Sequence, residues 1–195
     1  MIKVKDLCLS FDGCVILNRI SFSFPDSGVF ALMGSSGIGK SSLLKILSGL
    51  LMPDSGSFSG LDDKRVGILF QEDRLLPWHS ALKNVMLAME RPSQQEAKQL
   101  LNALEIEDAA DTYPTVLSGG MKRRLALARA IAFSPDVLLL DEPFSGIDEQ
   151  MKERIIPFIK KSAPLIVFAT HDIKEATMMG AMSILTLRDE NLTAT

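Results

Sequence analysis

Hydrophobic and polar positions alternate along the first two dozen residues, in two runs that a short turn signal separates. Residues 2–11 and 15–24 place apolar side chains at roughly every second position. Asp12-Gly13 lies between the runs and is a dipeptide typical of a tight turn between antiparallel strands. The pattern therefore predicts an N-terminal antiparallel β subdomain.

Farther along the chain the apolar runs lose this alternation and are separated by segments with helical character. Continuous apolar runs are typical of strands buried on both faces of a parallel sheet. They cover residues 29–33, 66–70, 137–140, 165–169 and 184–187, with helices expected over residues 40–50 and 121–133. The sequence therefore predicts an α/β fold with a mainly parallel sheet.

Residues 77–116 differ from this pattern, because helical spacing continues there without an intervening strand. Residues 81–90 and 93–104 are rich in Leu, Met, Ala, Glu, Lys and Gln, which favour helices. We expect a helical lobe over residues 77–116, inserted into a single domain that spans residues 1–195. Residues 189–195 are polar, and we expect them to fray.

Composition and charge narrow the classes of function. The chain has 195 residues, 47% of them hydrophobic, and a net charge of −3, which gives no general attraction to nucleic acid. Its 2 cysteines and 2 histidines are too few for a disulfide framework or a zinc site. The N-terminus lacks the apolar core of a secretory signal, and no run reaches the roughly 20 apolar residues of a membrane span. We expect a cytosolic chain without a nucleic-acid partner.

A glycine-rich segment follows the predicted strand 29–33. Residues 34–41 read Gly34, Ser35, Ser36, Gly37, Ile38, Gly39, Lys40 and Ser41, which fits the pattern G-x-x-x-x-G-K-[ST] of a P-loop. Inward-pointing backbone N–H groups and a helix N-terminus form a cradle for phosphate oxygens, and Lys40 adds a positive charge. The hydroxyl of Ser41 is expected on Mg²⁺, and that of Ser42 on a neighbouring phosphate. The alternative is a flexible serine-glycine turn.

Two acidic residues end the predicted strand 137–140. Carboxyl ends of parallel strands meet at the edge of the sheet where the phosphates would lie. Asp141 is therefore expected beside the Mg²⁺ ion. Glu142 is expected to deprotonate a water that attacks the γ-phosphate. Alternatively, the two acids only end a buried strand and cap the next helix.

A second anion-binding device precedes the predicted helix 121–133. Ser118, Gly119 and Gly120 combine a serine hydroxyl, exposed glycine backbone and a helix N-terminus, all of which can bind an anion. One ATP needs only one P-loop, so this second set of groups is in excess. Taken alone, this segment is more often a simple N-cap and turn.

Together these motifs resemble the ATP-binding cassette (ABC) ATPases in order and spacing, with a P-loop NTPase core, over nearly the whole chain. The resemblance rests on residues 34–41, Gln71, residues 117–120, residues 138–142, residues 145–148 and His171. It implies a head-to-tail dimer of this chain or of paired ABC ATPase subunits. In such a dimer, Ser118, Gly119 and Gly120 of one protomer bind the γ-phosphate held by Lys40 of the other.

The same resemblance assigns four further residues. Gln71 is expected near Mg²⁺ and the attacking water, and His171 is expected at the γ-phosphate. Asp148 is expected to cross the dimer interface, and Phe11 to stack on adenine. Without the resemblance, an aromatic side chain in a β-run such as Phe11 is more often part of the core.

Residues 70–78 and 120–124 are similar to importer ATPases of the nitrate, sulfonate and taurine group. This implies ATP hydrolysis at the cytoplasmic membrane face, coupled to separate permease subunits and indirectly to an extracytoplasmic binding protein. Leu75, Leu76 and Trp78 begin the lobe that receives a coupling helix of the permease, unless Trp78 packs inside the lobe. Arg123 departs from this group, which commonly has glutamine there.

Other functions of such a cassette stay open at this stage. An ABC exporter ATPase would have the same catalytic centre, and a soluble ABC clamp would act without a transporter. The chain ends soon after the final predicted strand, so we expect no C-terminal regulatory domain. The transported substrate is not encoded in these motifs.

Overall fold

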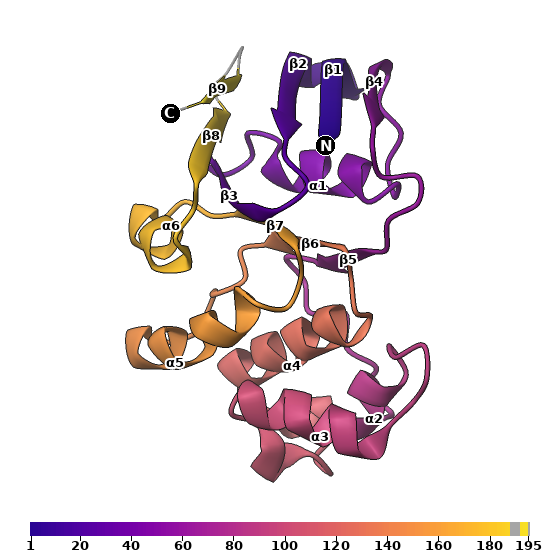
Figure 1. Cartoon of the computed structure of the whole chain (residues 1–195), viewed down its shortest axis with the longest axis vertical. Helices are drawn as coiled ribbons and strands as arrows, with labels where there is room; N and C mark the ends of the chain where they lie inside the picture. The colour runs from indigo at the N-terminus through magenta and orange to yellow at the C-terminus, as the bar shows by residue number, and fades with distance from the viewer. Residues whose placement is uncertain (188–191, 195) are drawn as a thin grey trace.

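The computed structural model describes residues 1–187 and 192–194, which form two sheets with helices around them (Figure 1). The smaller sheet is antiparallel in the order β2-β1-β4. It contains β1 (Ile2–Phe11), β2 (Cys14–Phe24) and β4 (Ser55–Ser59). The predicted N-terminal antiparallel subdomain is therefore confirmed. The hydrophobic pattern does not predict β4, because this strand has one apolar side chain and depends on its pairing with β1.

The larger sheet has the order β5-β6-β7-β3-β8-β9. Its parallel strands are β3 (Gly28–Met33), β5 (Val66–Leu69), β6 (Val137–Asp141), β7 (Leu165–Ala169) and β8 (Ser183–Leu187). Every residue of β6 and β7 is buried, which explains their unbroken apolar sequences. The predicted α/β fold with a mainly parallel sheet is confirmed.

The last strand, β9 (Leu192–Ala194), runs antiparallel to β8. The expectation of a frayed segment over residues 189–195 is therefore wrong for residues 192–194, because backbone pairing with β8 orders them. The rest of that segment, residues 189–191 and 195, lies outside the described residues.

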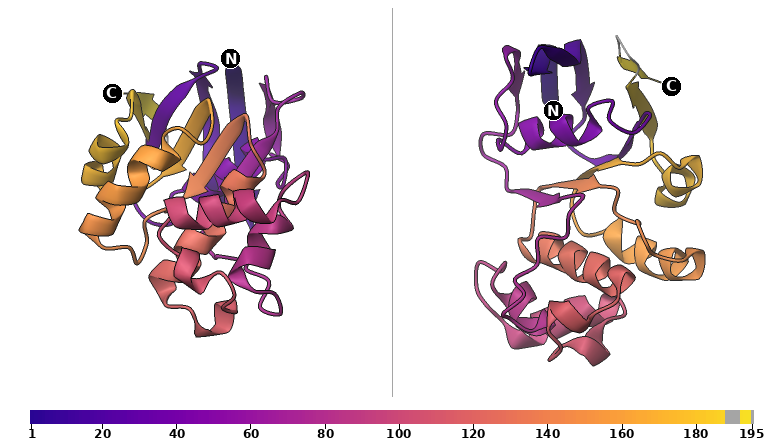
Figure 2. Two further views of the ribbon diagram at one scale, coloured as in Figure 1. Left: turned by 60° about the horizontal axis from the view of Figure 1, so that its bottom comes forward. Right: turned by 180° about the vertical axis from the view of Figure 1, so that it is seen from behind.

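Helices cover both faces of the parallel sheet (Figures 1 and 2). One face packs against α1 (Lys40–Leu47), and its core continues into the antiparallel sheet. The opposite face packs against α4 (Gly119–Ala132), α5 (Glu149–Ile159) and α6 (Ile173–Met179). Helix α1 ends before the expected residue 50, because Gly49 takes a φ of 74° that a helix cannot continue.

The helical lobe packs against α4, on the side away from the sheet (Figure 2). It contains α2 (Ala81–Met86), α3 (Gln94–Ala103) and two short 3₁₀ turns, η1 (Glu107–Ala109) and η2 (Pro114–Val116). Ser80 and Ser93 cap α2 and α3 by accepting hydrogen bonds from backbone N–H groups three residues later. The outer limits of the lobe, residues 77 and 116, and the single-domain assignment stay predictions.

Within residues 1–187 and 192–194, none of the helices has the length and apolar content needed to cross a bilayer.

Candidate functional site

The glycine-rich loop connects the carboxyl end of β3 to the first turn of α1. Gly39 caps α1 with a φ of 106° and offers no side chain to the helix N-terminus. A Cβ on Gly39 would lie 2.8 Å from Leu17 Cδ2 and 3.1 Å from the carbonyl oxygen of Ile16. Glycine is therefore required both by the backbone angle and by the close approach of β2. The helix N-terminus keeps its free N–H groups for a ligand.

Lys40 lies at the start of α1 and turns back over the loop. Its side chain is only 6% exposed, and Nζ donates to the carbonyl oxygens of Gly34 at 2.8 Å and Ser35 at 2.9 Å. These two bonds hold a buried ammonium inside the loop, where a phosphate would add the missing negative charge. Ser41 and Ser42 follow on the same turn, and both are half-buried.

Asp141 ends β6 and is 5% exposed. Burial raises the pKa of its carboxyl above the ordinary value, although a hydrogen bond with Ser41 and the charge of Lys40 act in the opposite direction. The first turn of α1 and the end of β6 therefore meet. Within residues 1–187 and 192–194, no three or more His, Cys, Asp or Glu side chains form a metal cage. One carboxylate and one hydroxyl nevertheless fit Mg²⁺, which keeps its waters and takes further oxygens from a nucleotide.

Glu142 and His171 form a pair at the same edge of the sheet. Glu142 follows β6 and His171 follows the neighbouring strand β7, so parallel pairing brings their backbones together. Glu142 Oε1 lies 3.1 Å from His171 Nδ1. The imidazole is largely exposed and the carboxylate is partly buried, which places the pair at the surface of the edge. The structure thus brings together two residues that are 29 positions apart.

Polar groups behind His171 form a connected chain. Thr170 Oγ1 donates to Glu175 Oε2 at 2.5 Å and accepts from the backbone N–H of Asp172 at 3.1 Å. Glu175 Oε1 accepts from Lys152 Nζ at 2.9 Å. These contacts link α5 and α6 to the segment that carries His171. These contacts could not be predicted from the sequence, because no local pattern pairs residues from two different helices.

Gln71 follows β5, and its side chain is exposed. Its backbone carbonyl accepts from Arg123 Nη1 at 3.2 Å. Arg123 on α4 also bonds the backbone of Asp141 and Glu142, so one buried side chain connects the ends of β5 and β6. In the sequence, Arg123 stands out only as a departure from a family pattern. The one sequence signal for a buried role of Arg123 was its position next to the apolar stretch of α4.

Ser118, Gly119 and Gly120, together called the signature residues, open α4 on the opposite face of the sheet from α1 (Figure 1). Ser118 caps the helix by accepting from the backbone N–H of Met121 at 3.3 Å. A Cβ on Gly119 would meet no atom within 4 Å, whereas one on Gly120 would lie 2.8 Å from the carbonyl oxygen of Gly146. Asp148, shortly after Gly146, caps α5 through the N–H of Met151. The signature and the loop around Asp148 thus lie together, with an open surface at Gly119.

For two aromatic side chains, Phe11 and Trp78, the sequence also allowed a position in the interior. In the structure, both side chains lie outside the hydrophobic core. Phe11 ends β1 and is 48% exposed, beside the turn to β2. Trp78 is 67% exposed at the start of the lobe. Both rings are therefore available for contacts outside the chain.

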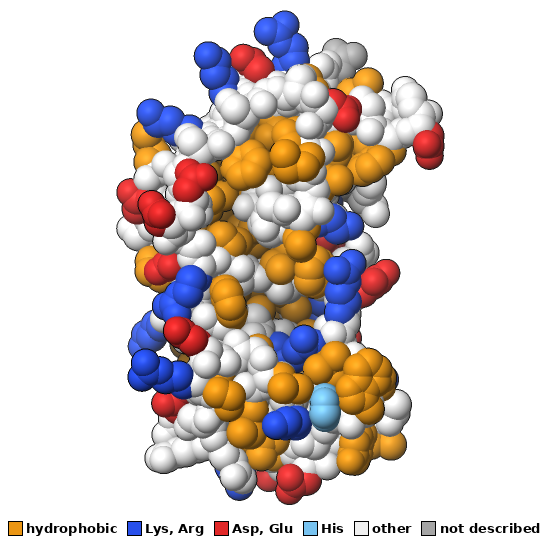
Figure 3. Space-filling view, turned by 90° about the vertical axis from the view of Figure 1, so that its right-hand side faces the viewer, with side chains coloured by type: hydrophobic (Ala, Val, Ile, Leu, Met, Phe, Trp, Pro, Cys, Tyr) orange, Lys and Arg blue, Asp and Glu red, His pale blue; other side chains and the backbone are white. Residues whose placement is uncertain are grey.

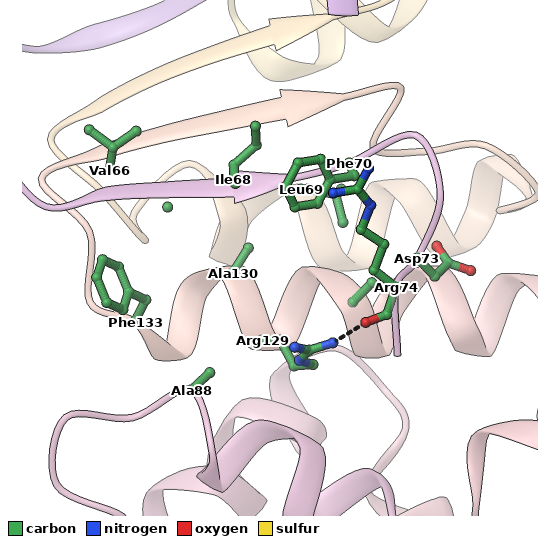
Figure 4. Close-up of a pocket in the computed structure, with 12 residues that line it drawn as sticks. Val66, Ile68, Leu69, Phe70, Asp73, Arg74, Ala88, Arg129, Ala130 and Phe133 are labelled. Atoms are coloured by element: carbon green, nitrogen blue, oxygen red, sulfur yellow. Dashed lines mark hydrogen bonds between the residues drawn. The ribbon is translucent and has the colours of Figure 1, made fainter. Parts of the chain in front are cut away.

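A groove lies beside β5, the edge strand of the parallel sheet (Figure 4). It has a volume of about 240 Å³, and its lining includes Phe70, Ala88, Ala130 and Phe133. Arg129 also borders it and donates to the carbonyl oxygen of Arg74 at 2.7 Å. Hydrophobic side chains gather in the middle of the face shown in Figure 3 and at its lobe end.

Comparison with known proteins gives one consistent result. A family model described as ABC transporter matches residues 17–145. The aliphatic sulfonates import ATP-binding protein SsuB 1 of Paracoccus denitrificans is 40% identical over 195 residues, covering 96% of this chain and 79% of that protein. The taurine import ATP-binding protein TauB of Rhizobium johnstonii is 38% identical over 186 residues, covering 87% and 71%.

Solved structures agree with the sequence relatives. A dimeric ATP-binding cassette in a post-hydrolysis state, bound to ADP and Pi, superposes with a TM-score of 0.90 at 27% identity, covering 100% of this chain and 98% of that one. A second dimeric structure of this bacterial ABC transporter cassette gives a TM-score of 0.87 at 28% identity, with the same coverage. The chain therefore belongs to the ABC transporter family, as one of its ATP-hydrolysing, ATP-binding subunits.

Proposed function

We propose that this chain is the ATPase subunit of an importer for sulfonate- or taurine-type substrates, acting as a dimer on separate membrane permease subunits. The import of aliphatic sulfonates and taurine by the named relatives supports the substrate class. One structural observation gives the main support for the ATPase mechanism. The Lys40 loop, Asp141 and the Glu142–His171 pair occupy one edge of one parallel sheet.

ATP binding is assigned to the P-loop and the neighbouring hairpin. Backbone N–H groups of residues 34–39 and the ammonium of Lys40 would bind the phosphates, with the hydroxyls of Ser41 and Ser42 beside them. The ring of Phe11 would stack on the adenine, because about half of its surface is exposed at the end of β1.

Ser41, Asp141 and Gln71 are the residues that would hold Mg²⁺. The contact between Ser41 and Asp141 already assembles a hydroxyl and a carboxylate, which are oxygen donors of the kind Mg²⁺ prefers. When bound, the ion would offset the negative charge of the terminal phosphates.

Hydrolysis is assigned to the Glu142–His171 pair. Water would attack the γ-phosphorus, the bond to the ADP oxygen would break, and the Glu142 carboxylate would take the proton of the water. His171 Nδ1 fixes Glu142 Oε1 at 3.1 Å and leaves an exposed ring for contact with the γ-phosphate. Gln71 would orient the water from the end of β5.

A dimer would complete each ATP site. Ser118, Gly119 and Gly120 open a helix on the other face of the sheet from Lys40, so a second copy can present them to the γ-phosphate. The open surface at Gly119 and the exposed Asp148 beside it support this arrangement. The dimeric form of the similar solved cassettes supports it as well.

The groove beside β5 would receive a permease segment at the cytoplasmic membrane face. Its apolar lining and the exposed Trp78 would be covered in such a complex. Arg129 adds a positive charge to the border of this apolar lining. An extracytoplasmic binding protein would contact the permease rather than this chain.

Glu142→Gln tests the ATPase assignment. The variant should bind ATP normally but lose turnover by about two to four orders of magnitude, because the general base is gone. ATP titration and phosphate release measure the two effects, with the exposed Glu153→Gln as a matched control. Near-normal hydrolysis by Glu142→Gln would remove Glu142 from this role. Co-purification of membrane permease subunits, followed by sulfonate and taurine uptake, tests the importer assignment.

A further inference from the structure

One buried cation lies between the groups assigned to hydrolysis. Arg123 is on the second turn of α4 and is only 3% exposed. A buried guanidinium is costly unless its N–H groups find acceptors. The positions of those acceptors therefore indicate what the side chain holds in place.

The acceptors belong to the ends of two strands. Nη1 donates to the carbonyl oxygens of Phe70 at 2.6 Å and Gln71 at 3.2 Å, where the chain leaves β5. Nη2 donates to the carbonyl oxygens of Asp141 and Glu142, where the chain leaves β6, and Nε donates to Glu142 O at 3.2 Å. The planar fork of one arginine thus spans both strand ends.

A carboxylate completes this set of contacts. Asp73 Oδ1 lies 3.1 Å from Arg123 Nη1, and Asp73 is partly buried on the loop after Gln71. The ion pair offsets the buried charge and fixes the same loop at a third point. Arg123 therefore holds the Gln71 loop through two backbone carbonyls and one side chain.

The backbone of Glu142 takes a conformation that depends on such contacts. Its φ is 49°, which is unfavourable for a residue other than glycine. The carbonyl oxygen accepts from Arg123 and from the N–H of Ser145, and the N–H donates to the carbonyl oxygen of Ala169. With the backbone held in this way, the side chain reaches His171 at 3.1 Å.

We propose that Arg123 is a positioning residue for ATP hydrolysis, which locks the backbone at Gln71 and Glu142 so that both side chains face one γ-phosphate. The inference rests on the proposed function of that site. Arg123 acts through these backbone groups and makes no contact with the nucleotide. Because α4 begins at the signature residues, Arg123 also connects the surface that a second copy would contact with the hydrolytic pair.

Arg123→Met tests the inference by removing the fork while keeping an apolar side chain. A displaced base slows the chemical step, so kcat should fall about 10- to 100-fold while KM for ATP stays within about threefold. Arg123→Lys keeps the charge but cannot span both strand ends, so kcat should still fall about tenfold. Full rescue by lysine would overturn the inference, because a charge alone would then suffice.

Asn84→Ala is the matched control for the loss of a buried polar tether. Asn84 is buried on α2 and donates to the carbonyl oxygens of Leu76, His79 and Ser80, away from the two strand ends. Its kcat per folded molecule should stay within about twofold of wild type, at a similar loss of thermal stability. If Arg123→Met matches this control in kcat, or loses ATP affinity as much as kcat, Arg123 is only structural.

Amide hydrogen exchange gives a readout that does not depend on turnover. In Arg123→Met, peptides covering residues 70–74 and 141–146 should exchange at least about tenfold faster, with residues 34–42 unchanged. Arg123→Lys and Asp73→Asn provide the same measurement if Arg123→Met fails to fold. Unchanged exchange at both strand ends would overturn the inference, whereas wild-type protein that neither binds nor hydrolyses ATP would overturn the proposed function itself.

Discussion

Two glycine-rich segments open helices on opposite faces of the same parallel sheet, and they differ in how the helix N-termini are capped. At α1 the cap is Gly39, which offers no side chain, and the buried ammonium of Lys40 lies beside the loop. At α4 the cap is Ser118, which accepts from the N–H of Met121, and the first turn has an open surface at Gly119. The first segment holds a buried ammonium inside its own loop, whereas the lysine nearest the second segment, Lys122, lies four residues after Ser118 and is half-buried.

Under the proposed function, this difference would explain why one chain carries two segments suited to bind anions. A complete phosphate site needs backbone N–H groups, a cation and metal-side oxygens together, and only the α1 side has all three. The α4 side supplies a helix N-terminus and a hydroxyl at an exposed surface. In the proposed dimer, each segment would be half of a site, and the second half would come from another copy of the chain.

The largest effect is expected when the P-loop, the α1 half of the proposed ATP site, is disrupted. Lys40→Ala removes the ammonium that the loop holds through the carbonyls of Gly34 and Ser35. ATP affinity should fall at least about 100-fold, because a buried charge facing the phosphates is lost. Titration with ATP measures the loss, and Lys45→Ala on the same helix is the control. Equal affinities for the two variants would contradict the phosphate cradle.

A smaller effect is expected when the α4 half is broken. Gly119→Asp places a negative charge where the γ-phosphate of the other copy would lie, so ATPase activity should fall about 10- to 100-fold. Affinity for ATP in the monomer should not change, and the new carboxylate should favour the N-terminus of its own helix. Gln94→Asp, at the same position of α3, is the control. Loss of ATP affinity in monomeric Gly119→Asp would place this segment in the site of its own chain.

The smallest expected effect separates capping from phosphate binding. Ser118→Ala and Ser93→Ala remove equivalent caps, each accepting at 3.3 Å, and each should cost about 1 kcal/mol of stability. Only Ser118→Ala should also lower ATPase activity, by about 5- to 20-fold, through the lost hydroxyl contact. Thermal unfolding and phosphate release measure the two effects. Equal activities of the two variants would leave Ser118 with a capping role only.

The two regions also differ in how far the sequence predicts them. The P-loop is a continuous segment, and its glycines, Lys40 and Ser41 act through neighbours in the chain. Arg123 instead bonds residues that lie 50 to 53 positions earlier and 18 to 19 positions later, which no local pattern reveals. Strand β4 shows the same limit, since pairing with β1 rather than its own composition makes it a strand. Motifs were predictable, whereas the contacts that align them required the fold.

The most direct test of an ATP site shared between two copies is to mix the Lys40→Ala and Gly119→Asp variants. Lys40→Ala keeps an intact signature and Gly119→Asp keeps an intact P-loop, so a mixed two-fold dimer contains one complete site. An equimolar mixture should recover about a quarter of wild-type ATPase activity, because half of the dimers are mixed and each has one of two sites. Recovery above the average of the separate variants supports a site shared between copies. A mixture no more active than that average would contradict it.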